Sequence, residues 1–284
     1  MRTIGLTALS MLAFAANSVL ARLAFATGDA EPWSYTGIRL ASGAFVLYAL
    51  LALRGQIPSR STLGGSWYGA AALFVYAIAF SIAYLELGAG TGALILFASV
   101  QVGIIGWALF KGDRPGALEW LGLAVAIAAF VYLVSPSAVA PAPLGTALMI
   151  GSGLSWAAYT VIGRGSRAPL VDTAGNFIRC LPVAAALAAA GVLLHPQQPT
   201  AIAYAVASGA LASGLGYAVW YAALPHLQST SAAVVQLTVP AIAAIGGVLL
   251  IGEAITSHLL VSSLGILGGV ALSLCAAARR RSGR

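Results

Sequence analysis

The sequence predicts an all-α membrane protein of ten transmembrane helices, arranged as two inverted five-helix repeats. Three observations lead to this fold class. Hydrophobic residues make up 60% of the 284-residue chain and charged residues only 7%, whereas soluble domains carry about 25% charged residues. Apolar runs long enough to span a bilayer as a helix, about 20 residues, recur along the chain. Motifs of the first half return in the second half in the same order.

The continuity of the apolar runs excludes the other fold that spans membranes. Strands of an outer-membrane barrel alternate apolar and polar residues, whereas these runs are apolar throughout. Helices satisfy every backbone hydrogen bond within one segment, as a lipid environment requires. The first run, Ile4 to Phe25, has the position of a signal peptide, but similar runs follow it, so we expect it to be the first spanning helix.

Gly, Pro and charged clusters separate the apolar runs and set the predicted helix boundaries. The first five spans are expected at residues 4–26, 33–53, 66–86, 90–110 and 116–134. The second five are expected at residues 143–163, 171–194, 200–223, 230–251 and 257–277. Between these sets, Ser135 to Pro143 contains three prolines and no charge, so it cannot continue a helix. The predicted organisation is a first repeat at 1–135, a second, inverted repeat at 143–278 and a basic cytoplasmic tail at 279–284.

The Lys and Arg residues predict the orientation, because they accumulate in cytoplasmic loops. With both termini in the cytoplasm, eleven of the fourteen basic residues lie on that side. These are Arg2, Arg54, Arg60, Lys111, Arg114, Arg164, Arg167, Arg279, Arg280, Arg281 and Arg284. Arg22 then lies outside, and Arg39 and Arg179 fall within spans. We therefore expect a multi-pass inner-membrane protein of a bacterium, whose charge of +7 faces anionic lipid and not nucleic acid.

Two alignments carry the internal repeat. Phe14-Ala-Ala-Asn-Ser-Val-Leu-Ala-Arg22 matches Trp156-Ala-Ala-Tyr-Thr-Val-Ile-Gly-Arg164, and Ile38-Arg39 matches Ile178-Arg179. An odd number of crossings in each half requires the second copy to be inverted, the arrangement of many secondary carriers, whose substrate site lies near the bilayer midplane. A duplication that serves only the structure is the alternative.

A family resemblance follows from these motifs and from two turns. Lys111-Gly-Asp-Arg-Pro115 and Gly252-Glu253 occupy equivalent places after the predicted fourth and ninth helices, which are rich in Ala and Gly. Over nearly its whole length the chain resembles the drug/metabolite transporter (DMT) superfamily, EamA type. The resemblance implies that helices 1 to 4 and 6 to 9 surround a central cavity, with helices 5 and 10 at the periphery. Trp156-Ala-Ala-Tyr159 and Tyr217-Ala-Val-Trp220 are similar to strings in the YddG type of aromatic amino acid exporter, which implies amino acid export.

Two aromatic clusters in the second half are candidates for substrate contact. A metabolite cavity covers an organic side chain and offers a few polar groups. Trp156 and Tyr159 are three residues apart, and so are Tyr217 and Trp220, with Tyr221 adjoining. Each cluster therefore presents rings on one face of a helix. Core packing is the alternative.

A third aromatic series, Tyr76, Phe80 and Tyr84, recurs every four residues. This spacing predicts a ladder of rings along one side of a helix. Tyr76 and Phe80 are cavity candidates, whereas Tyr84, near a predicted helix end, is expected in the aromatic belt at the membrane surface.

Polar side chains inside the spans are few and are expected to face the bundle interior. The amides Asn17, Gln101 and Gln236 are candidates to bind the polar end of a substrate. The alternative is hydrogen bonding between helices, worth about 0.6 kcal/mol on average.

Arg39 and Arg179 are costly inside a bilayer, about 2.5–3.5 kcal/mol each on insertion scales. In one interpretation, an arginine meets a substrate carboxylate. In the other, both bond to helix-end carbonyls and stabilise the two halves equally, which their equivalent positions favour.

Acidic residues and one proline complete the candidates. Glu86, near an outer helix end, is expected to be solvated, with proton coupling as the alternative. Asp113 and Glu253 are expected to cap the helices that follow them. Pro240, inside the predicted ninth helix, is a candidate hinge because it removes a backbone hydrogen bond and kinks the helix.

No catalytic residue, metal site or cofactor is predicted, because no His-Glu-x-x-His motif and no intramembrane pair of aspartates occurs. The resemblance and the aromatic candidates together favour a monomeric secondary transporter that exports aromatic and other neutral amino acids by alternating access, with small molecules and lipid as its partners. The alternatives are an exporter of another metabolite or drug in the same superfamily, an intramembrane enzyme, or a channel. Proton coupling and facilitated diffusion are both left open.

Overall fold

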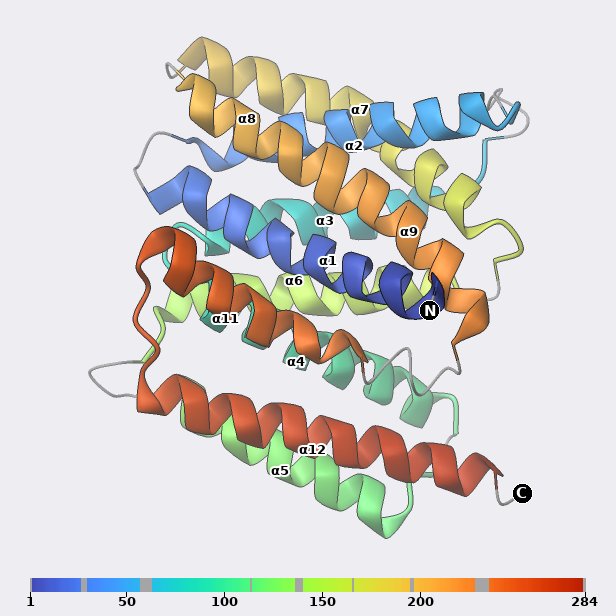
Figure 1. The fold of residues 1–284 in the computed structure, drawn as a ribbon, viewed down its shortest axis with the longest axis vertical. Helices are drawn as coiled ribbons and strands as arrows, with labels where there is room; N and C mark the ends of the chain where they lie inside the picture. The colour runs from blue at the N-terminus through green and yellow to red at the C-terminus, as the bar shows by residue number, and fades with distance from the viewer. Residues whose placement is uncertain are drawn as a thin grey trace.

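The computed structural model describes residues 2–26, 30–56, 63–112, 114–135, 140–164, 166–194, 197–227 and 235–282. All regular secondary structure in these ranges is helical. The helices lie side by side in one bundle, and the two ends of the chain lie on the same side of it (Figure 1). We call this the terminus side and the opposite one the far side.

The first half of the chain contains five helices. They are α1 (Arg2–Ala26), α2 (Pro32–Leu53), α3 (Trp67–Ala83), α4 (Ala89–Phe110) and α5 (Ala117–Val134). The second half begins with α6 (Pro143–Ile162) and α7 (Pro169–Leu194). One continuous span then combines α8 (Pro199–Ala207), the π-helical η1 (Ser208–Leu215), α9 (Gly216–Ala223) and the short 3-10 helix η2 (Leu224–His226). The last helices are α11 (Thr238–Ile251) and α12 (Ser257–Ser282).

These elements agree with the predicted spans, and in the described chain eight spans are long and apolar enough to cross a membrane. The other two predicted spans correspond to α3 and α11, which are apolar but shorter, with 17 and 14 residues. The all-helical, mostly apolar fold class is therefore confirmed.

Proline and glycine set several helix ends. Four helices start at a proline, where the missing N–H would have no intrahelical partner in any case. These prolines are Pro32, Pro143, Pro169 and Pro199. At the other end, α11 stops at Gly252, whose φ of 75° gives the left-handed conformation that ends many helices.

Pro240 does not lie in the interior of a helix, as its sequence context predicted. The ninth span was predicted at 230–251, with Pro240 in its interior, but α11 starts at Thr238 and Pro240 is in its first turn. A proline there breaks no hydrogen bond of α11, so the expected kink within this helix is wrong. A turn at Leu237 instead separates α11 from the helical residues 235–236. The hinge role of Pro240 stays a prediction, and residues 228–234 lie outside the described ranges.

Two helix pairs stand at opposite ends of the bundle. Figure 1 shows α5 beside α12 at one end and α2 beside α7 at the other, and both pairs pack extensively. Glycines allow close backbone contact in each pair. A Cβ atom on Gly122 would lie 2.5 Å from the carbonyl oxygen of Gly269, and one on Gly269 would lie 2.5 Å from that of Gly122. A Cβ on Gly37 of α2 would lie 2.4 Å from the carbonyl oxygen of Ala184 in α7.

Charge differs between the two sides of the bundle. The basic residues at the ends of the described helices gather on the terminus side, and Arg22 lies near the far side. Those on the terminus side are Arg2, Arg54, Lys111, Arg114, Arg164, Arg167, Arg279 and Arg280. The alternation of helix direction therefore sorts the charges as predicted. Which side faces the cytoplasm stays a prediction.

Candidate functional site

A small chamber lies in the middle of the bundle, where α1, α3, α4, α6 and α9 meet. Six of the predicted site residues line it: Asn17, Tyr76, Phe80, Trp156, Tyr217 and Gln236. Five further lining residues were not among the predicted site residues: Phe14, Ser18, Leu96, Phe97 and Val100. The cavity volume is about 30 Å³, enough for only a few water molecules.

Trp156 forms the centre of the aromatic wall of this chamber. Its ring centroid lies 4.8 Å from that of Tyr76, 5.1 Å from that of Tyr159 and 5.5 Å from that of Tyr217. The last two contacts are stacked, with interplanar angles of 25° and 17°. Trp156 therefore joins rings from α3, α6 and α9, and the predicted Trp156 and Tyr159 pair does share a helix face.

Trp220, in contrast, lies outside the chamber wall. It is buried, and its ring packs edge-on against Phe14 of α1, with centroids 5.9 Å apart. Phe14 also contacts Tyr217 at 5.8 Å. Trp220 thus holds α9 against α1, while Tyr217 of the same helix faces the chamber.

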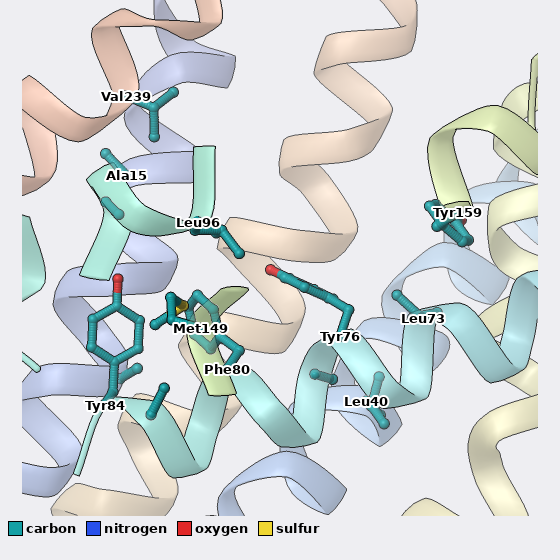
Figure 2. Packing of buried hydrophobic residues seen from close by; sticks show 14 of the residues in the cluster. Ala15, Leu40, Leu73, Tyr76, Phe80, Tyr84, Leu96, Met149, Tyr159 and Val239 are labelled. Carbon is teal, nitrogen blue, oxygen red and sulfur yellow. The ribbon is translucent and has the colours of Figure 1, made fainter. Parts of the chain in front are cut away.

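The predicted ladder of rings on α3 is present. The centroids of Tyr76 and Phe80 are 5.6 Å apart, and those of Phe80 and Tyr84 are 4.7 Å apart. Figure 2 shows the three side chains along one side of α3, with the hydroxyl of Tyr76 directed toward Leu96 of α4. Leu96 lines the chamber. Of the two hydroxyls in this series, that of Tyr76 lies at the chamber, whereas that of Tyr84 donates to the Ala89 carbonyl oxygen at 3.4 Å.

Tyr84 does not belong to a membrane-surface belt, so that expectation is wrong. Its side chain is fully buried. Gly92 of α4 makes room for the ring, because a Cβ at Gly92 would lie 2.4 Å from the Tyr84 ring. A local spacing rule could not foresee a glycine on the facing helix.

Asn17 joins the chamber to the π-helical segment η1. Its Oδ1 accepts hydrogen bonds from Ser208 Oγ at 2.8 Å and Ser213 Oγ at 3.2 Å. π-Helical turns are uncommon and are often found at functional sites. The apolar run at 200–223 predicted an ordinary helix, and the string Ser-Gly-Ala-Leu-Ala-Ser-Gly, which is rich in small residues, is the sequence feature that marks the π-helical segment.

The two glutamines have different surroundings. Gln236 lines the chamber, whereas Gln101 faces a separate apolar groove of about 260 Å³ between α4, α5, α6 and α12. The structure therefore does not bring all three predicted amides together.

The two arginines also differ, contrary to the expectation of equal roles. Arg179 Nη1 donates to the carbonyl oxygens of Gly64 and Gly175, and Nη2 donates to that of Leu63 at 3.4 Å. Its guanidinium also lies over the ring of Trp67, 5.8 Å from the centroid. Arg179 therefore attaches the segment before α3 to α7, which is the structural role.

Arg39 lies deep in the bundle with only 2% of its surface exposed. Nη2 donates to the Tyr76 hydroxyl at 2.9 Å. The guanidinium carbon lies 4.6 Å from the Phe80 ring centroid and 5.3 Å from that of Tyr76. Nη1 has no hydrogen-bond partner among the described residues. Arg39 thus contacts the rings of Tyr76 and Phe80, which line the chamber, but does not line the chamber itself.

A hydrogen-bonded series connects the chamber to the terminus side. Tyr159, which stacks on Trp156, donates to Thr173 Oγ1 at 3.3 Å, and the Thr173 and Tyr221 hydroxyls are 3.0 Å apart. Tyr221 lines a crevice of about 310 Å³ beside Arg54 and Arg167. Tyr159 and Tyr221 therefore lie between the chamber and the terminus side, and neither belongs to the chamber wall.

On the far side, Glu253 ties three segments together. Its Oε1 pairs with Arg22 Nε at 3.2 Å, and its Oε2 accepts from Ala89 N at 2.9 Å. Arg22 Nη1 also donates to the carbonyl oxygen of Tyr84 at 3.4 Å. Glu253 therefore caps α4 and not the helix that follows it, which corrects the predicted role. Its position at a turn allows this, because α11 brings the turn beside the start of α4.

Glu86 is exposed, and its Oε2 accepts a hydrogen bond from Gly145 N at 2.7 Å in the first turn of α6. A carboxylate at a helix N-terminus is stabilised by the unpaired N–H groups there. Asp113, also a predicted cap, lies outside the described residues.

Comparisons of the sequence with known proteins find similarity to membrane transporters. A family model described as the EamA-like transporter family matches residues 143–275. An uncharacterized protein of Pseudomonas aeruginosa is 50% identical over 276 residues, covering 96% of this chain and 94% of that protein. The threonine/homoserine exporter RhtA of Escherichia coli K12 is 28% identical over 229 residues, covering 78% of this chain and 74% of the exporter.

A solved crystal structure has a similar fold. It matches with a TM-score of 0.64 at 21% sequence identity, covering 96% of this chain and 99% of that chain. This likeness concerns the fold alone.

Proposed function

Because residues 143–275 match the EamA-like transporter family, we propose that this chain exports aromatic and other neutral amino acids by alternating access through the central chamber. The family is one of membrane transporters and not of enzymes. The similarity to a threonine/homoserine exporter supports amino acids as the substrate class. The similarity to YddG-type exporters, which favours aromatic amino acids, stays a prediction.

One observation carries the proposal: the chamber combines aromatic rings with a few polar groups in the middle of an apolar bundle. Trp156, Tyr76 and Tyr217 supply flat apolar surfaces, and Asn17 and Gln236 supply amides. A neutral amino acid needs both kinds of contact. At about 30 Å³ the chamber is too small for an amino acid, so transport requires the wall to move.

Two inverted repeats supply a route for this movement, and the helix contacts support them. If the two halves are repeats, the packing of α3 against α6 corresponds to the packing of the α8–α9 span against α1. The packing of α4 against α6 likewise corresponds to that of α11 against α1. All four of these packing contacts are present. The pairs α2 with α7 and α5 with α12 map onto themselves, and they lie at the two ends of the bundle (Figure 1). The family match at 143–275 spans most of the second predicted repeat.

Export as the direction of transport rests on the resemblance, whereas the charge distribution predicts which side of the bundle each opening faces. If the basic terminus side faces the cytoplasm, the crevice lined by Arg54, Arg167 and Tyr221 opens toward the cytoplasm. On the far side, the ion pair of Arg22 and Glu253 joins the turn after α11 to α1. Substrate would then enter through the crevice, pass Tyr221 and Tyr159, and reach the chamber.

Proteoliposome counterflow tests the proposed function. Vesicles that hold the purified protein are loaded with unlabelled L-phenylalanine or L-threonine and diluted into the same amino acid carrying a label. A carrier predicts transient accumulation of label that saturates with concentration, with and without a pH gradient. Protein-free vesicles are the control. Absence of counterflow for both amino acids, or flux that increases linearly without saturation, would contradict the proposal.

A further inference from the structure

The guanidinium of Arg39 lacks a counter-ion in the described part of the protein. The described carboxylates all lie in turns or at helix starts: Glu31, Glu86, Glu119, Asp172 and Glu253. Arg39 lies about 10 Å along α2 from its first residue at 1.5 Å per residue, and none of these carboxylates bonds to it. An arginine in this environment is expected to be paired or to serve a ligand.

The repeat-related Arg179 provides an internal comparison. Arg179 bonds to three backbone carbonyls at the edge of the bundle, whereas Arg39 bonds to one tyrosine hydroxyl and keeps Nη1 unpartnered in the described chain. A purely structural role would satisfy Arg39 in the same way. The difference therefore points to a partner that the chain itself does not supply.

The bond between Arg39 and Tyr76 leaves a donor directed at the chamber. Arginine has no acceptor, so its Nη2 donates and the Tyr76 oxygen accepts. The phenolic proton of Tyr76 then remains available to another acceptor. Tyr76 lines the chamber, and its hydroxyl is directed toward Leu96 on the opposite wall (Figure 2).

A third donor lies nearby on α1. Both hydrogen bonds of Asn17 use its carbonyl oxygen as the acceptor. The Asn17 amide nitrogen, which can only donate, makes no hydrogen bond among the described residues. The chamber wall thus presents donors from Tyr76 and Asn17, with the charge of Arg39 behind them. A carboxylate group complements this arrangement because it accepts hydrogen bonds and carries the missing charge.

We propose that the chamber recognises a substrate carboxylate, which accepts from the Tyr76 hydroxyl and has Arg39 as its counter-ion. This inference rests on the proposed function for the place of binding, and it narrows the substrate class to carboxylate-bearing compounds. Amines and amides that lack the carboxylate are poor ligands. Phe80 and Tyr76 cover the guanidinium, so direct contact between a ligand and Arg39 requires these two side chains to shift.

Binding measured apart from transport tests the inference. The quenching of tryptophan fluorescence in purified protein is titrated with L-phenylalanine, 3-phenylpropionate, L-phenylalaninamide and phenethylamine. The two carboxylates are expected to bind at least tenfold more tightly than the amide and the amine. Equal affinities, or no binding by any of the four, would overturn the inference.

Variants separate recognition from folding. In Arg39→Gln the preference for carboxylates over the amide should fall to about one, and Arg39→Lys should restore part of it. Arg179→Gln is the matched control and should keep the preference even if thermal stability declines. If Arg39→Gln does not fold, Tyr76→Phe keeps the ring and the arginine and should lower the preference at least threefold. An unchanged preference in the folded variant would contradict the proposal.

Two further outcomes distinguish the inference from the proposed function. Carboxylate preference in binding without counterflow of phenylalanine or threonine would support the inference and reject the amino acid carrier. Counterflow with equal affinity for phenylalanine and its amide would support the amino acid carrier and reject the carboxylate inference.

Titrations repeated in chloride-free sulfate buffer test for chloride as the counter-ion. A preference that depends on the presence or absence of chloride would overturn the carboxylate assignment.

Discussion

Trp156→Ala is expected to reduce transport per folded protein by about tenfold or more. Trp156 contacts Tyr76, Tyr159 and Tyr217, and aromatic pairs contribute about 0.5–1.5 kcal/mol each. Loss of three pairs removes at least about 1.5 kcal/mol of interaction free energy that holds the chamber wall in place. A difference of about 1.4 kcal/mol changes an equilibrium constant tenfold. Trp156→Phe should retain part of the activity because it keeps a ring. Counterflow normalised to monodisperse protein measures the effect.

The matched control for this substitution is Trp120→Ala. Trp120 lies on α5 with 48% of its surface exposed, away from the chamber. It should transport at the wild-type rate. Wild-type transport by Trp156→Ala, or an equal loss in both variants, would show that Trp156 has no special place in the substrate pathway.

Gly37→Val is expected to destabilise the protein more than any surface change. A Cβ at Gly37 would lie 2.4 Å from the Ala184 carbonyl oxygen and 2.6 Å from the Ala188 nitrogen, and these backbone atoms cannot move away independently. Overpacking costs about 1–3 kcal/mol and sometimes more. On the scale of soluble domains, 3 kcal/mol lowers the melting temperature by about 6–12 °C. The separation of α2 from α7 should also displace Arg39.

Gly151→Val is the control, because Gly151 also lies within a helix but has no atom within 4 Å of an added Cβ. The thermal midpoint and the monodisperse yield in detergent should match the wild type for Gly151→Val and decrease for Gly37→Val. Similar midpoints for both variants would mean that α2 and α7 do not pack as closely as described.

The sequence predicted the helices well because membrane helices depend on local composition. The start of the sixth span followed from Pro143, which begins α6 as predicted, whereas α7 begins at Pro169, two residues before the predicted start. The ring contacts of Trp156 with Tyr159 and of Tyr76 with Phe80 followed from helical spacing. Each of these features is determined by the sequence of a single helix.

Features that depend on two segments could not be read from spacing. Tyr84 is buried because Gly92 of another helix makes room for it, and Glu253 caps α4 because two turns meet. Gln101 has the polarity of a cavity residue, yet the rotation of α4 directs it to the apolar groove. The different surroundings of Arg39 and Arg179 also depend on tertiary contacts, although their sequence positions are equivalent.

Val100→Cys tests whether the chamber opens alternately to the two sides of the membrane. Val100 lines the chamber with 5% of its surface exposed, and cysteine has a similar size. The background replaces the native Cys180 and Cys275 by alanine. A charged, membrane-impermeant thiol reagent is added to oriented vesicles from either side, with and without L-phenylalanine.

Alternating access predicts labelling of Val100→Cys from both sides, with the rates changed by substrate. Val125→Cys, which is exposed on the outer face of α5, should not react with the charged reagent from either side. Labelling of Val100→Cys from one side only, or at rates that substrate does not change, would rule out alternating access through the chamber.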